Sequence, residues 1–130
     1  MFASVQFDVY TRMTDKVIVT NLSALKAKYG RRLSKIRAAV RRLITADNRR
    51  GIRTTLVALD SKTTMKRLGA TRVTDAADPK QNKTAIDGVY RRLQPDYLML
   101  LGATDVIPHQ DLQNPVYDPD DDPDRCAFGD

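Results

Sequence analysis

The stretch Tyr97-Leu98-Met99-Leu100-Leu101-Gly102 is the strongest apolar run of the chain and decides its fold class. Two shorter apolar runs precede it, at 17–19 and 56–59. None of the three alternates between apolar and polar residues, which predicts strands buried on both faces. Such strands are typical of parallel sheets, and we expect them at about 16–20, 54–60 and 97–102.

Helical patterns separate these strands. Apolar residues recur at steps of three and four from 22 to 44 and again from 85 to 93. Asn21 suits the first helix as its N-cap, and Gly30 predicts a kink or a break into two helices. A short helix is expected after Asp60 or Ser61, and residues 70–82 are expected to be mostly loop. The order strand–helix–strand–helix–helix–strand predicts an α/β three-layer sandwich with a mostly parallel sheet.

Two further segments flank the α/β domain, which we place at residues 1–104. Alternation at 3–10 predicts an extra N-terminal strand, at an edge of the sheet or packed elsewhere, with a connection to about residue 14. Residues 105–130 are rich in Asp and Pro, which predicts an irregular acidic segment. The most apolar strand would normally be central, so we expect a chain truncated before a following subdomain.

Composition excludes several classes of protein. The 130 residues hold a single cysteine, so an internal disulfide and a C-x-x-C zinc site are impossible. No run of eighteen apolar residues exists, so we expect no membrane partner. The start of the chain lacks the pattern of a signal peptide, which indicates a cytoplasmic location for the chain as given.

Charge divides the chain into a basic body and an acidic tail. All sixteen acids are Asp. Residues 1–95 carry 21 Lys and Arg against 7 Asp, whereas residues 96–130 carry one Arg against 9 Asp. A basic body favours nucleic acid, an anionic surface or an acidic partner, and that partner can be the acidic tail itself.

The helical region 26–53 concentrates this positive charge, with eleven Lys and Arg and one acid, Asp47. A helical arc opposite the apolar stripe holds four of these cations, and they are candidates for binding an anionic partner: Lys28, Arg31, Lys35 and Arg42. A solvated outer face is one alternative. Nucleic acid is another, weakly supported because no aromatic residues are interleaved for base stacking. An Asp-rich protein partner is the third.

Acidic residues near the end of the chain suggest calcium. Asp118, Asp120 and Asp122 alternate like the start of a calcium loop. The EF-hand version fails, because Pro123 stands where Gly is needed and Gly129 where a bidentate Glu is needed. Either a calcium site of another type or an exposed acidic loop fits this segment.

The expected strand ends supply the remaining candidate site residues. Asp60, Gly102 and Asp105 lie at or just beyond the ends of two of the strands, and ligand sites of parallel sheets lie at such ends. A small self-contained enzyme using Asp60, Asp105 and His109 is therefore one hypothesis. His109 and Cys126 could form a nucleophilic dyad, but two separate loop residues are the simpler interpretation.

The segment 95–108 reads Pro-Asp-Tyr-Leu-Met-Leu-Leu-Gly-Ala-Thr-Asp-Val-Ile-Pro, an apolar strand that runs into Gly, an acid and Ile-Pro. Further matching elements follow and precede it: Asn114-Pro115, 121–125, Asp130, 25–30 and 50–52. Together they resemble the gingipain-type, caspase-related cysteine peptidases, over about 16–130 and most specifically over 95–130. Family members often place the acid directly after Gly, whereas Ala103 and Thr104 intervene here.

The resemblance implies a non-catalytic N-terminal α/β subdomain that scaffolds a catalytic subdomain absent from this chain. The family's catalytic His lies in a His-Gly pair and its Cys ends a later apolar strand. Here His109 precedes Gln110, and no apolar strand leads into Cys126, so no catalytic residue carries over. The parent would be a cysteine peptidase, a hydrolase whose relatives are often secreted and can bind calcium. The partner would be the catalytic subdomain or another chain of the same assembly, and this chain alone is predicted to be inactive. The alternative is a basic module that binds nucleic acid or an acidic protein through 26–53.

Overall fold

The computed structural model of the protein describes residues 14–110. The predicted strand at 3–10 and most of the acidic segment, from residue 111 on, lie outside the described residues. None of the described helices is long and apolar enough to cross a membrane. The elements follow one another in this order: β1 (Lys16–Thr20), α2 (Leu22–Tyr29), the 3-10 turn η1 (Gly30–Arg32), α3 (Leu33–Arg49), β2 (Thr54–Ala58), α4 (Lys62–Arg67), α5 (Pro79–Leu93) and β3 (Tyr97–Leu100).

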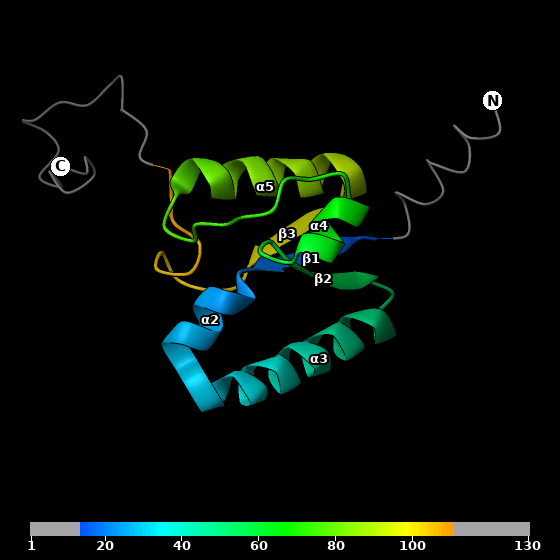
Figure 1. Ribbon diagram of the computed structural model, residues 1–130. Helices are drawn as coiled ribbons and strands as arrows, with labels where there is room; N and C mark the ends of the chain where they lie inside the picture. Colours follow the sequence, from blue (N-terminus) through cyan, green and yellow to red (C-terminus); the bar gives the residue numbers. More distant parts are fainter. Residues whose placement is uncertain (1–13, 111–130) are drawn as a thin grey trace, which may run out of the picture.

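The three strands form one parallel sheet in the order β2-β1-β3. The helices lie on both faces, α3 on one side and α5 on the other (Figure 1). This arrangement confirms the predicted α/β class and parallel sheet. The three predicted strands are present, although β2 and β3 each end two residues earlier than expected.

The central position belongs to β1, not to the most apolar strand. Val17, Ile18 and Val19 are fully buried, and Ile18 is paired with Leu56 on one side and Met99 on the other. Within residues 14–110 the strand expected at 97–102 lies at an edge, and β1 is its one described neighbour. The connections explain this result, because α2 and α3 lead to β2 over one face and α5 leads to β3 over the other, so that both later strands pair with β1.

The main core lies between the sheet and α5. Val17, Val19 and Val57 contribute its sheet side, and Ala85 and Val89 contribute the helix side. Because side chains alternate along a strand, Ile18 points to the opposite face, the one that α3 covers. Both faces of the central strand are thus covered by helices.

Local signals set the ends of the helices. The side chain of Asn21 accepts a hydrogen bond from Ala24 N at 3.0 Å, as expected of an N-cap. The predicted break at Gly30 is confirmed, since Gly30 has a φ of 53° and η1 separates α2 from α3. Lys28 therefore does not share a helix with Lys35 and Arg42, so the single arc drawn through them from a uniform helix is wrong.

Helix α5 starts earlier than the sequence pattern indicated. Asp78 accepts hydrogen bonds from Lys80 N and Gln81 N, and Pro79 occupies the first turn, where a missing N–H costs nothing. The expectation of loop for 70–82 is thus wrong at 79–82. An N-cap acid followed by Pro was the signal for this start.

Candidate functional site

Asp60, at the carboxyl end of β2, caps the neighbouring helix α2. Its carboxylate accepts hydrogen bonds from Leu22 N at 2.9 Å, from Ser23 N at 3.1 Å and from the Ser23 hydroxyl at 2.6 Å. Burial raises the pKa of Asp60, but these hydrogen bonds together outweigh it and lower the pKa below its usual value. The short helix α4 is capped instead by Ser61, which accepts from Thr64 N.

Asp105, beyond the end of β3, forms an ion pair with Lys28 of α2. Lys28 Nζ lies 2.7 Å from Asp105 Oδ2 and 5.3 Å from the centre of the Tyr29 ring. The hydrogen bond from Lys28 lowers the pKa of Asp105, and the same contact raises the pKa of Lys28. One candidate cation for an anionic partner is therefore paired within the chain.

Gly102 is required by packing. Its φ is 131°, and a Cβ atom built there would lie 2.6 Å from Cβ of Val106, a fully buried residue. The sequence placed Gly102 among the candidate site residues at the strand ends. In the structure the close neighbour is the side chain of Val106.

The remaining catalytic and metal candidates do not gather into a site within the described chain. His109 is exposed, and the adjacent Gln110 donates a side-chain hydrogen bond to Pro79 O. Residues 14–110 contain no group of three or more His, Cys, Asp or Glu that could hold a metal ion. Cys126 and the calcium candidates lie outside the described residues: Asp118, Asp120 and Asp122.

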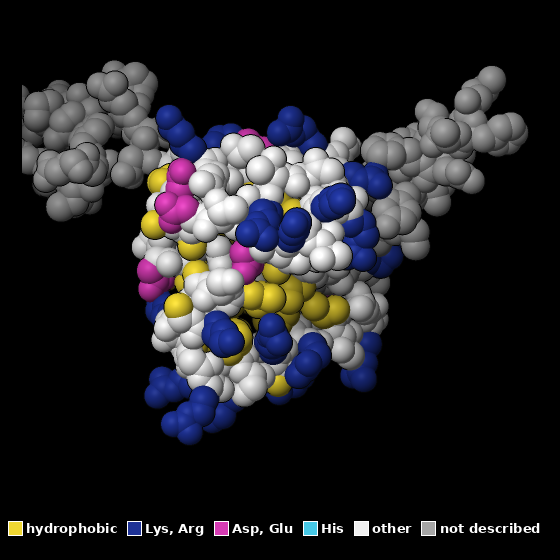
Figure 2. All heavy atoms as spheres, in the orientation of Figure 1, with side chains coloured by type: hydrophobic (Ala, Val, Ile, Leu, Met, Phe, Trp, Pro, Cys, Tyr) yellow, Lys and Arg dark blue, Asp and Glu magenta, His cyan; other side chains and the backbone are white. Residues whose placement is uncertain are grey.

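The other cations of the predicted arc remain available. Arg31, Lys35 and Arg42 are exposed, and none forms an ion pair with a described residue. Lys and Arg side chains are spread over much of the visible face (Figure 2). The surface around Arg31, Lys35 and Arg42 has the positive charge that an anionic partner needs.

Sequence reasoning missed the role of Asp47, the one acid of α3. Asp47 is buried and accepts hydrogen bonds from Lys16 Nζ at 3.0 Å, from the Thr54 hydroxyl at 3.1 Å and from Arg50. The bond from Lys16 lowers its pKa, burial opposes this effect, and Arg50 and Thr54 add to the lowering. A signal was available, because Asp47 continues the apolar stripe of α3 at the spacing of Val40 and Ile44.

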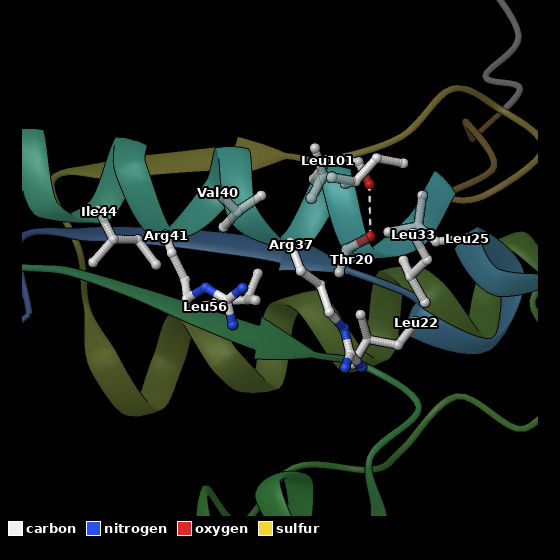
Figure 3. A pocket seen from close by; sticks show the side chains of 11 residues that line it. Thr20, Leu22, Leu25, Leu33, Arg37, Val40, Arg41, Ile44, Leu56 and Leu101 are labelled. Carbon is white, nitrogen blue, oxygen red and sulfur yellow. Dashed lines mark hydrogen bonds between the residues drawn. The ribbon is translucent and has the colours of Figure 1, made fainter. Parts of the chain in front are cut away.

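An apolar groove between α3 and the sheet was also missed. It has a volume of about 270 Å³ and is lined mainly by aliphatic side chains, with Arg37 and Arg41 of α3 reaching over it (Figure 3). In Figure 2 an apolar patch is visible between basic side chains on either side. The groove therefore combines an apolar lining with positive charge at its mouth.

The edge strand β3 exposes apolar side chains. Tyr97 is 59% exposed, Leu98 41% and Leu100 46%, and Tyr90 of α5 is 52% exposed. No described strand pairs with the outer side of β3.

Comparison with known protein families, curated proteins and solved structures finds no match to the chain. The surfaces with functional potential are thus the β3 edge, the α3 groove and the basic face.

Proposed function

We propose that this chain is a non-catalytic α/β subdomain of a gingipain-like cysteine peptidase, and that it scaffolds the catalytic subdomain through the edge of β3. The proposal rests on one observation, the exposed apolar edge of β3. The resemblance of 95–130 to that family supplies the identity of the partner. The strand-end carboxylates support a scaffold as well, because Asp60 and Asp105 both bind α2.

The outer side of β3 has backbone N–H and C=O groups that can pair with a further strand. Tyr97 N and Leu101 N donate to Asp15 O and Val19 O, on the β1 side. Because successive residues of a strand direct their N–H and C=O groups to opposite sides, Leu98 and Leu100 direct theirs to the open edge. An exposed, apolar edge strand is an aggregation risk when uncovered and a docking surface when a partner strand covers it.

Association with the catalytic part tests the proposal. The coding sequence beyond codon 130 should contain an apolar strand ending in His-Gly and a later one ending in Cys. That downstream part, produced separately, should bind this chain in isothermal titration calorimetry. Leu98→Lys/Leu100→Lys should weaken binding at least tenfold, whereas Thr63→Lys/Thr71→Lys, two exposed residues elsewhere, should leave it unchanged. Equal affinities of both variants would contradict docking at β3, and absence of the two motifs would remove the peptidase partner.

Peptidase activity provides an independent test. The purified 130-residue chain should not cleave peptides in the presence of a thiol reductant, because the proposed nucleophile and base lie outside it. Cleavage that survives purification and disappears in Cys126→Ala would contradict the scaffold proposal. The same assay with His109→Ala would then show whether the two residues act together.

A basic binding module is the second candidate, favoured by one observation. Arg31, Lys35 and Arg42 are exposed and carry charge that no described acid neutralises. Binding to a DNA or RNA duplex should then weaken linearly on a log–log plot against salt concentration. Replacing all three by Gln should reduce that slope, and Lys62→Gln/Lys66→Gln/Arg67→Gln on α4 is the charge-matched control. Absence of binding at low salt would leave a solvated basic face.

A further inference from the structure

The groove beside α3 has one wall from the helix and a floor from the sheet. Leu33, Ile36, Val40 and Ile44 follow the steps of three and four that place them on one side of α3, and all four line the groove. Leu56 of β2 lines it from the sheet. The stretch of α3 from Leu33 to Ile44 is about 16 Å long at 1.5 Å per residue. The groove is therefore long and apolar.

The side chains that line the groove from the sheet offer no free hydrogen-bond donor to an occupant. Thr20 is the polar residue of the lining that belongs to the sheet, and its hydroxyl donates to Leu101 O at 2.7 Å. The hydroxyl is thus already engaged with the chain. A carboxylate would find no donor on this side of the groove, whereas an alkyl chain needs none, because a buried polar group without a partner is costly.

The mouth of the groove carries two arginines. Arg37 and Arg41 are one helical turn apart, are exposed, and leave α3 on the same side (Figure 3). Neither forms an ion pair with a described residue. Asp47, the one acid on α3, is occupied by Lys16 and Arg50 at the far end of the helix. The charge at the mouth is therefore positive and unopposed.

We propose that this groove binds the carboxylate form of a medium-chain fatty acid, with the alkyl chain along α3 and the carboxylate at Arg37 and Arg41. The charge is complementary, and a guanidinium can bind a carboxylate through two parallel hydrogen bonds. The volume of about 270 Å³ lies slightly below the usual range for small-molecule sites, roughly 300 to 1,000 Å³, as suits a small, slender ligand. A single alkyl chain needs a much narrower groove than a helix, which is about 10 Å across.

The site is distinct from the surfaces of the proposed function. The fatty-acid site uses the side of α3 next to the apolar stripe, whereas Lys35 and Arg42 lie on the outward side of the same helix. It also does not depend on a partner strand at β3. Lys35→Gln/Arg42→Gln therefore removes the same charge from the same helix without touching the groove.

Calorimetric titration of the full chain with dodecanoate, below its micelle concentration, tests the inference. Saturable binding with one molecule per chain is expected. Arg37→Gln/Arg41→Gln should weaken it at least tenfold, Lys35→Gln/Arg42→Gln should change it less than twofold, and dodecanol should bind at least tenfold more weakly than dodecanoate. Circular dichroism spectra would confirm that both variants fold.

Several results would overturn the inference. No saturable binding of dodecanoate to the full chain would do so, as would equal losses in the two double variants, which would show a general effect of charge. Equal affinity for dodecanol would show that the arginines do not recognise the carboxylate. A synthetic peptide of residues 111–130 is titrated in the same way as a third ligand. If it binds in an Arg37- and Arg41-dependent manner while dodecanoate does not, the groove is a docking site for an acidic protein segment.

Discussion

Lys16 Nζ lies 3.0 Å from Asp47 Oδ2, which ties the start of the central strand to the last turns of α3. Asp47 is fully buried, and Arg50 and Thr54 complete its set of donors. The backbone continues the same connection, since Ile52 N donates to Asp47 O at 2.9 Å. This buried carboxylate thus fixes where the chain leaves α3 and enters β2.

Asp47→Asn should lower the melting temperature by about 10 °C or more, because it removes one charge of a buried, hydrogen-bonded cluster and leaves Lys16 without its partner. Asp87→Asn is the matched control, since Asp87 pairs with Lys83 at the exposed surface and such pairs contribute little. Thermal unfolding followed by circular dichroism gives both values. Similar small shifts in the two variants would show that the Asp47 cluster is not important for stability.

Acid should destabilise the protein by protonating the carboxylates of Asp47 and Asp60. The pKa values of Asp47 and Asp60 are lowered below the ordinary 3.8, so each contributes stability that is present above that value. The contribution is lost as the pH falls through the lower pKa of the folded state. We expect the melting temperature to decline below about pH 4 and the decline to be shallower in Asp47→Asn. Melting curves from pH 2.5 to 7 would reveal a pH-independent stability if this assignment is wrong.

Gly102→Ala should cost about 3 kcal/mol or more, because the new methyl group would meet buried Val106 and the backbone would be strained at a φ of 131°. Gly51→Ala separates the two effects. Gly51 also has a positive φ, 82°, but nothing lies within 4 Å of its Cβ position. We expect a cost of about 1 kcal/mol there. Urea unfolding measures both, and equal costs would mean that contact with Val106 is relieved at no expense.

Asp60→Ala should destabilise the chain by about 1–2 kcal/mol, the usual effect of removing a side chain that caps a helix N-terminus. Asp60→Asn keeps one acceptor oxygen and should restore part of the loss. Hydrogen exchange of the Leu22 and Ser23 amides would locate the effect at α2. Unchanged protection of these amides in Asp60→Ala would contradict the capping role.

Local sequence was sufficient where structure depends on neighbouring residues. The three apolar runs predicted the three strands, Asn21 predicted its cap and Gly30 predicted the helix break. The cap and the helix break depend on interactions within about four residues along the chain, whereas the strands pair with residues 38 and 81 positions away and were predicted from the apolar composition of their own residues. The start of α5 at Pro79 is also set by local residues. The periodicity of its apolar residues, however, indicated a later start.

The sequence alone determined the α/β class, the parallel strands and the concentration of charge near α3. Tertiary structure alone decided which strand is central, because an apolar run has the same composition at the middle and at the edge of a sheet. It also decided the partners of Asp60 and Asp105, because Leu22 and Lys28 lie 38 and 77 residues away along the chain. Finally, it set Arg37 and Arg41 over an apolar groove. Such roles arise from packing between elements, and periodicity reports only which face of an element is apolar, not what that face meets.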